Sequence, residues 1–290
     1  MATYNILSID GGGLRGIVPL RILQKVQELC NDMHKGEKIQ HTFDLMAGTS
    51  TGGLIISCMN LKDPANPTQP QYNLDQIIDM YARDGSTIFP IRSGISKFFH
   101  KVSNLFDPEF SARGLDKVLK EYIKDQRIKD TLRPIIISSY DLHGNSATFF
   151  KTSEASENES ANALLYDVCR ATSAAPTFLP AYSFSYKGNQ LTGIDGGVFA
   201  NNPTMAAIAE IKKFGQWDYY KKKDNTKVAF DDLRVLSLGT GSYIGTISEK
   251  DAVSWGQLQW AQNIPNIMMK GVNQSTHYES NEIMDHGKYL

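Results

Sequence analysis

The sequence predicts an α/β fold built around a mostly parallel central sheet. Two segments carry this prediction, residues 4–29 and residues 43–59, because each contains a buried strand, a glycine-rich turn and a helix in succession. Strands that alternate with helices in this way are typical of parallel α/β sheets. A chain of 290 residues is near the upper limit for one hydrophobic core, so we expect a single domain over residues 1–290.

The spacing of apolar residues predicts the elements, since a buried strand has a short apolar run and a helix repeats apolar residues every three or four positions. The first two units are a strand at 4–10, glycines at 11–16, a helix at 18–29, a strand at 43–47, a turn at 48–53 and a helix at 54–59. Beyond them we expect helices at 74–81, 115–123 and 164–175, strands at 134–140, 191–195 and 233–238, and a helix starting at Asn201-Asn202-Pro203. Proline or polar composition predicts exposed loops at 63–71 and 154–161.

Composition limits the classes of function. The formal net charge is −1, so the chain lacks the basic excess that general nucleic-acid binding needs. Cys30, Cys58 and Cys169 are well separated, lie in apolar surroundings and have no metal-ligand spacing. We therefore expect reduced core thiols, no bound metal, no cofactor and no nucleic-acid partner.

The N-terminal residues 1–10 carry no basic segment followed by a long apolar run, so they do not predict a secretory signal peptide. No stretch reaches the roughly 18 uninterrupted apolar residues that a membrane span requires. These observations predict a cytoplasmic protein, and export by a route without an N-terminal signal stays open.

A serine lies in a glycine-flanked turn, Gly48-Thr-Ser-Thr-Gly52, which matches the pattern G-x-S-x-G between an expected strand and its helix. A nucleophile on such a turn needs strained backbone angles and small neighbours, which the glycines supply. The free N–H groups of the following helix would also help to stabilise an oxyanion. Ser50 is therefore the candidate nucleophile, and the alternative is that Ser50 or Thr49 only caps the helix.

A second glycine motif, Asp10-Gly-Gly-Gly-Leu-Arg-Gly16, follows the first strand and contains G-x-G-x-x-G. A dinucleotide-binding turn would need an acidic strand end about 20 residues on, where the sequence instead predicts helix. The other interpretations are an oxyanion hole formed by the backbone N–H groups of Gly12 and Gly13, and a glycine turn without a ligand. Arg15 would lie near any anion on this loop, as a contact for a phosphate headgroup or as the partner of a surface carboxylate.

A serine hydroxyl needs a proton acceptor. None of the six histidines is in a glycine-flanked or strand-end position, whereas Asp195 ends an apolar strand, is followed by two glycines and precedes a well-capped helix. Aspartate is a weak base with a reference pKa of about 3.9, but it is ionised at neutral pH and partial burial raises its basicity. Asp195 is therefore the candidate base, and a turn aspartate that bonds its own backbone is the alternative.

Taken together and in this order, the motifs resemble those of the patatin-like phospholipases. The likeness extends from residue 4 to about residue 241 and is weaker beyond. Besides the two glycine motifs it includes Arg170-Ala-Thr-Ser-Ala-Ala-Pro176, Asp195-Gly-Gly197, Val198-Phe-Ala-Asn-Asn-Pro203 and Leu236-Ser-Leu-Gly-Thr-Gly241. Plant-type members continue beyond the position that corresponds to Leu290, so we expect that the C-terminal part has been trimmed or lost.

The resemblance implies a three-layer α/β/α fold and calcium-independent hydrolysis of the fatty-acyl esters of phospholipids or related glycerolipids. It also implies a dyad of Ser50 and Asp195, an acyl-enzyme intermediate and an oxyanion hole from Gly12 and Gly13, with Gly11 as a third candidate donor. The implied partner is a membrane or micellar lipid that is contacted transiently at its interface. Headgroup, positional and acyl-chain preferences, the oligomeric state and the biological role stay open.

Two apolar segments bear on access to lipid. Residues 88–106 interleave aromatic and basic side chains, which is typical of a lid or an interfacial patch, and an ordinary core helix is the alternative. Trp255 and Trp260, with the apolar residues at 264 and 267–269, form a second stripe for which packing in the core is the favoured interpretation.

Two rival functions are kept at this point. A conventional α/β-hydrolase with a Ser-His-Asp triad would use His277 or His286 as base, but only one expected strand precedes Ser50, which leaves little room for the strands that such enzymes place there. A non-enzymatic nucleotide-binding module would use residues 11–16, but the presence of both Ser50 and Asp195 disfavours it.

Overall fold

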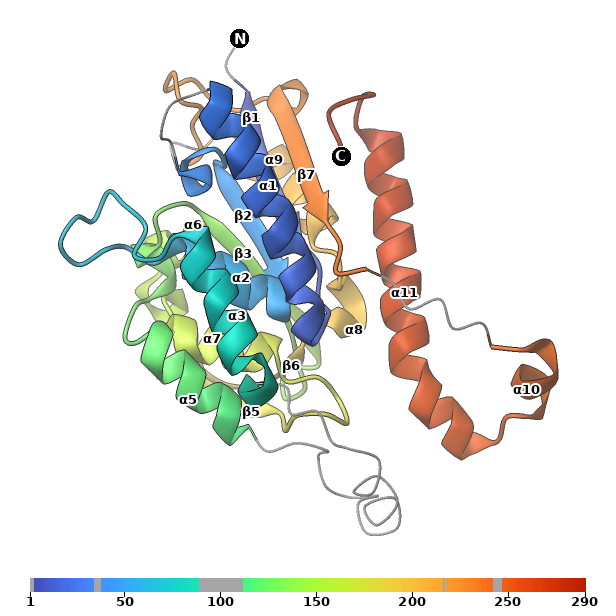
Figure 1. Ribbon diagram of the computed structural model, residues 1–290. Coiled ribbons are helices and arrows are strands. Elements are labelled where there is room, and N and C mark those ends of the chain that lie inside the picture. The colour runs from blue at the N-terminus through green and yellow to red at the C-terminus, as the bar shows by residue number, and fades with distance from the viewer. Residues whose placement is uncertain (1–2, 34–37, 89–111, 216, 218, 242–246) are drawn as a thin grey trace.

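The computed structural model describes residues 3–33, 38–88, 112–215, 217, 219–241 and 247–290. Seven strands of the described chain form one sheet (Figure 1). In chain order they are β1 (Tyr4–Ile9), β2 (Leu45–Thr49), β3 (Ile135–Asp141), β4 (Ser146–Lys151), β5 (Tyr182–Tyr186), β6 (Asn189–Asp195) and β7 (Leu233–Leu238).

The sheet has a parallel centre and an antiparallel end. Its order is β5-β6-β3-β2-β1-β7, and β4 also pairs with β3. β1 is parallel to β2 and β7, and β2 is parallel to β3. β4 and β6 both run antiparallel to β3, and β5 runs antiparallel to β6. The expected mostly parallel sheet is confirmed.

Helices cover both faces of the sheet (Figure 1). The helices of the described residues are α1 (Ile17–Met33), α2 (Thr51–Asn60), α3 (Leu74–Ile88), α5 (Arg113–Tyr122), α6 (Thr152–Glu157), α7 (Leu165–Thr172), α8 (Gly197–Ala200), α9 (Thr204–Phe214), α10 (Glu249–Ser254) and α11 (Gln257–Ile283). One core lies between the sheet and α1, α2, α3, α5 and α7, and a second, smaller core lies between the sheet and α9. This is the three-layer α/β/α architecture that the family resemblance implied.

The strand before Ser50 differs from its expected bounds. β2 begins at Leu45 and continues to Thr49, so the turn expected at 48–53 is reduced to Ser50 alone. Gly48 stays in the strand because it has a strand on each side, pairing with Ile9 of β1 and Ile137 of β3. The strand-to-helix turn at Ser50, called the elbow below, is therefore tighter than the glycine pattern indicated.

The segment expected to be an exposed loop at 154–161 is exposed at residues 156–160, but its prediction as a loop is wrong. These residues form α6 and a short 3-10 helix, and Ala155 and Ala161 are buried. The polar residues that suggested a loop lie between these alanines, and the Asn158 side chain accepts a hydrogen bond from the Ser160 N–H at the start of the second turn. Asparagine is a preferred residue at the start of a helix, so the presence of Asn158 did not indicate irregular structure.

Core packing of the stripe on α11 is also wrong for most of its members. The exposed side chains are Trp260, Ile264, Ile267 and Met268. The opposite side of the helix packs against the body of the protein through Thr276 and Ser280, which are buried. Of residues 88–106, only Ile88, at the end of α3, is described and buried; the predicted lid lies outside the described residues. No helix in the described ranges has the length and apolar character needed to cross a bilayer.

Candidate active site

The sheet topology brings the ends of four strands together. β2 pairs with residues 135–138 of β3, and β6 pairs with residues 139–141. β4 pairs along one side of β3, so β2 and β6 both pair along its other side and meet end to end there. Thr49 pairs with Ser138 and Asp195 pairs with Ser139, so Ser50 follows β2 at the point where β6 ends. The glycine loop after β1 and the loop after β7 lie at the same end of the sheet as Ser50, since β1, β2 and β7 are parallel.

Ser50 occupies a strained turn. Its φ and ψ angles are 54° and −123°, in a region that side-chain-bearing residues rarely adopt. The flanking glycines permit this turn through close contact. A Cβ on Gly48 would lie 2.5 Å from the Gly52 carbonyl carbon, and a Cβ on Gly52 would lie 2.1 Å from the Ile9 carbonyl oxygen. Both glycines of the pattern are therefore required by packing.

The Ser50 side chain does not cap α2. It stands at the N-cap position, yet it makes no capping hydrogen bond, and its hydroxyl bonds the Asp195 carboxylate instead. Its backbone N–H donates to Thr172 Oγ1 at 2.8 Å, and Thr172 Oγ1 donates to the Ser138 carbonyl at 2.6 Å. The interpretation that Ser50 is only a helix cap is therefore wrong. Sequence reasoning missed Thr172, although it lies in one of the matched flanking segments.

Asp195 is buried with 4% of its surface exposed. Its Oδ1 accepts the Gly197 N–H at 2.8 Å, which is the turn bond weighed as an alternative, and the carboxylate also accepts the hydrogen bond from Ser50. Burial raises the pKa of Asp195 to about 6, against the lowering effect of these two hydrogen bonds. The carboxylate is therefore a stronger base than an ordinary aspartate and is still mostly ionised at neutral pH.

The glycine loop lies beside this pair, but one of its expected donors is engaged. The Gly11 N–H donates to the Asn201 carbonyl at 3.0 Å, so the prediction of Gly11 as an oxyanion donor needs correction. The Gly12 and Gly13 N–H groups donate to no acceptor in the described ranges. The loop is held by Thr240, whose hydroxyl donates to the Gly11 carbonyl at 2.8 Å. Gly12 and Gly13 are left as the candidate donors.

Arg15 is exposed and turns back toward the loop after β7. Its Nη1 donates to the Gly241 carbonyl at 3.2 Å, and its Nε donates to the Gly12 carbonyl at 3.4 Å. No carboxylate partner of Arg15 is found among the described residues. Its contact with a phosphate headgroup stays a prediction.

The features that the rival functions require are not found in the described structure. His277 Nδ1 bonds the Tyr289 hydroxyl at 3.0 Å, and both His277 and His286 are exposed. The segment where a nucleotide-binding fold would place an acidic strand end belongs to α1.

No group of three or more metal-ligating side chains could hold an ion in the described ranges. Cys58 and Cys169 are buried and unpaired, and burial raises the pKa of both thiols.

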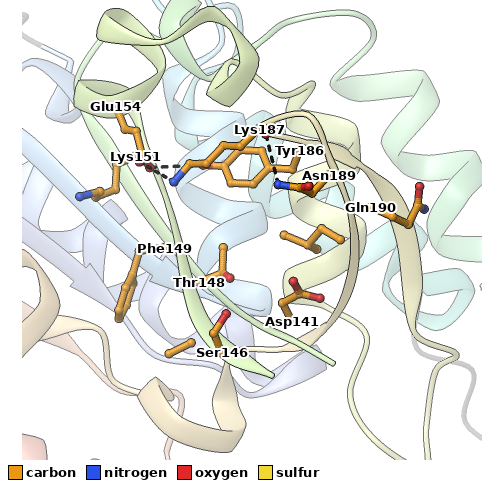
Figure 2. Close-up of a pocket in the computed structure, with 12 residues that line it drawn as sticks. Asp141, Ser146, Thr148, Phe149, Lys151, Glu154, Tyr186, Lys187, Asn189 and Gln190 are labelled. Carbon is orange, nitrogen blue, oxygen red and sulfur yellow. Dashed lines mark hydrogen bonds and ion pairs between the residues drawn. The ribbon is translucent and has the colours of Figure 1, made fainter. Parts of the chain in front are cut away.

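Figure 2 shows a recess lined by β4, α6 and the β5–β6 hairpin, which contains neither Ser50 nor Asp195. The charged groups that line it already have partners. Lys187 pairs with Glu154, and Asp141 Oδ1 accepts two backbone N–H groups at 3.0 Å. The recess therefore offers a weaker basis for acid–base chemistry than the edge where β2 meets β6.

Known proteins resemble this chain over most of its length. The family model described as patatin-like phospholipase matches residues 7–208. Patatin-like protein 3 of Arabidopsis thaliana is 33% identical over 274 residues, which is 88% of this chain and 63% of that protein. Patatin-like protein 1 of Arabidopsis thaliana is 31% identical and Patatin-T5 of Solanum tuberosum is 28% identical; the alignments cover 96% and 94% of this chain and 70% of each relative. The chain thus spans less than two thirds of the length of the first of these relatives.

Proposed function

Because the chain belongs to the patatin-like phospholipase family, we propose that it is a lipid acyl hydrolase that cleaves fatty-acyl esters of phospholipids or related glycerolipids. The observation that carries this proposal is the hydrogen bond from the Ser50 hydroxyl to the buried Asp195 carboxylate, at the edge of the sheet that also holds the glycine loop. The substrate would be presented by a membrane or a micelle, which the protein contacts transiently.

In the proposed reaction, Ser50 Oγ attacks the ester carbonyl carbon while the Asp195 carboxylate takes the hydroxyl proton. The carbonyl electron pair moves to oxygen, and the oxyanion accepts hydrogen bonds from the Gly12 and Gly13 N–H groups. When the intermediate collapses, the bond to the leaving alcohol breaks and Asp195 returns the proton to it. A water molecule then attacks the acyl-enzyme, Asp195 again takes the proton, and Ser50 is regenerated with release of the fatty acid.

The choice of base is supported by its environment. A general base works best when its pKa lies near the operating pH, and ordinary aspartate falls about three units short of neutrality. Burial closes most of that gap for Asp195, whose pKa is about 6. No histidine in the described chain is needed for the scheme.

The proposed function is tested by fatty-acid release from mixed phospholipid vesicles in excess chelator. We expect release to continue in chelator, because proton transfer and oxyanion stabilisation are both assigned to protein groups. A water-soluble short-chain ester serves as the comparison substrate. Hydrolysis of the soluble ester without any release from vesicles or micelles would make the protein a general esterase. Inertness toward both substrates would remove the acyl-hydrolase assignment.

The pH dependence of kcat/KM on the soluble ester should follow Asp195. Only the ionised carboxylate can accept the Ser50 proton, so kcat/KM should fall about tenfold per pH unit below about pH 6 and reach a plateau above it. The soluble ester keeps the surface charge of vesicles out of the measurement. A profile that stays flat down to pH 4, near the ordinary aspartate value, would contradict the raised pKa of this base.

A further inference from the structure

Three side chains from distant parts of the sequence form a continuous hydrogen-bonded chain beside the site. Asp10 is the first residue of the glycine motif and has 5% of its surface exposed. Its Oδ2 accepts a hydrogen bond from Asn273 Nδ2 of α11 at 2.9 Å. Asn273 Oδ1 in turn accepts one from Asn201 Nδ2, also at 2.9 Å. Asn201 lies six residues after Asp195, so this hydrogen-bonded chain connects both halves of the site, the glycine loop and the Asp195 turn, to α11.

Asn201 joins the two loops directly. Its backbone carbonyl accepts the Gly11 N–H at 3.0 Å. Its side-chain Oδ1 is buried without a hydrogen-bond partner and fills the space beside two glycines, since a Cβ on Gly11 would lie 2.3 Å from it and a Cβ on Gly197 would lie 2.9 Å from it. A change in the orientation of the Asn201 amide would therefore alter the spacing between the glycine loop and the Asp195 turn.

The donors and acceptors of this hydrogen-bonded chain fix the orientation of the Asn201 amide. A carboxylate only accepts hydrogen bonds, so Asp10 requires the NH₂ group of Asn273 to face it. The Asn273 oxygen then faces Asn201, which requires the Asn201 NH₂ group to face outward and its oxygen to face the glycines. Oδ2 of Asp10 can still accept when Oδ1 carries a proton, so the direction of the chain is kept in both states of this carboxyl group.

We propose that Asn273 is a positioning residue for the reaction, which sets the spacing between the oxyanion donors and the Ser50–Asp195 pair through Asn201. This inference rests on the proposed function. It assigns to α11 a role beyond its packing against α8 and α9, because its contact with the site is made through amide hydrogen bonds of fixed direction. An error of about 1 Å in such an arrangement can cost on the order of a hundredfold in rate.

Burial raises the pKa of Asp10 to about 8, with no neighbouring charge among the described residues contributing to the rise. Asp195 is the other titratable group at the loops that the chain connects. Two charged side chains lie near members of this hydrogen-bonded chain in sequence. Arg15, five residues after Asp10, turns to the Gly241 carbonyl, and Lys270, one turn before Asn273, is exposed. A second carboxyl group introduced at position 273 would therefore share protons with Asp10.

The test compares Asn273→Ala, Asn273→Asp and the double variant Asp10→Asn/Asn273→Asp. We expect Asn273→Ala to lower kcat about 10- to 100-fold with KM nearly unchanged. Compared with the unchanged protein at the same pH, Asn273→Asp should keep the largest share of activity at low pH, where a shared proton replaces the lost donor. That share should fall as pH rises because two carboxylates then repel each other. The double variant restores a donor at position 10 and an acceptor at position 273, so it should recover activity and lose this alkaline decline.

Asn266→Ala is the matched control, because Asn266 is an exposed asparagine of the same helix. It should leave kcat, KM and the pH profile unchanged. An Asn273→Ala variant with unchanged kcat, or a double variant no better than Asn273→Asp, would overturn the inference.

A second readout does not depend on turnover. Hydrogen exchange of the Gly11 N–H, measured in a Ser50→Ala background, should become faster when Asn273→Ala is added, because the carbonyl that accepts this N–H is no longer held. Unchanged exchange would count against the link even if activity falls. If the protein with Ser50 intact proves inert toward every ester, faster exchange would still support the link. Only the proposed function would then be overturned.

Discussion

Replacing Ser50 by alanine should reduce fatty-acid release by about 10⁴-fold or more. The hydroxyl is the atom that forms the acyl-enzyme, and alanine offers no oxygen in its place. The fold should be kept, since the backbone N–H of residue 50 can still donate to Thr172 and the alanine methyl group fits where the serine Cβ now lies. Release of fatty acid from vesicles and the thermal unfolding midpoint, measured on the same preparation, check both halves of this expectation.

Ser57→Ala provides the matched control. Ser57 is buried in α2, the helix that Ser50 precedes, and its hydroxyl accepts only a weak hydrogen bond from the Cys169 thiol at 3.3 Å. This substitution also removes a buried oxygen, but it leaves the elbow and Asp195 in place, so most activity should be kept. If Ser50→Ala kept more than a tenth of the activity, or if the two variants lost activity equally, Ser50 would not be the nucleophile.

Replacing Asp195 by asparagine should cost about 10²- to 10⁴-fold in kcat/KM, the range assigned to a positioned general base. Asparagine has nearly the same shape, and its amide oxygen can still accept the Gly197 N–H that Asp195 Oδ1 accepts at 2.8 Å. What it cannot do is take the Ser50 proton at neutral pH. The residual activity should also lose the rise through about pH 6, because the group responsible for it has been removed.

His277→Gln separates this scheme from a Ser-His-Asp triad. His277 bonds Tyr289 rather than Ser50, so its replacement should leave kcat/KM within about twofold and affect at most the packing of the chain end. Should Asp195→Asn keep most of its activity while His277→Gln loses it, the dyad would be wrong and a triad using this histidine would replace it.

The residues that bear the proposed chemistry could be predicted because local rules determine them. Ser50 and its flanking glycines predict a strand-to-helix turn, and Asp195 lies at a strand end before two glycines. The position of Asp195 at a strand end made it the candidate base for Ser50, and the family resemblance implied the same pair. The structure adds the reason, which is that β2 and β6 end against each other on one edge of β3.

The supporting contacts could not be predicted, since they join residues far apart in the sequence. Thr172 bonds the N–H of Ser50 across 122 positions, and Asn273 bonds Asp10 across 263. Neither contact has a local signature. The prediction for Gly11 failed for the same reason, because its N–H is engaged by the Asn201 carbonyl, which no spacing within the glycine motif could indicate. On α11, periodicity identified an apolar stripe, but it could not show which side of the helix packs.

The backbone at position 50 places activity and robustness in conflict. A side-chain-bearing residue held at a φ of 54° and a ψ of −123° costs on the order of 1–3 kcal/mol, and glycine would release most of that cost. A laboratory selection that rewards heat resistance alone should therefore drift toward glycine at this position and accumulate sturdy but inert proteins. Selection for thermal stability in this protein therefore needs an activity screen at every round. The Ser50→Gly substitution that increases the free energy of unfolding also removes the nucleophile.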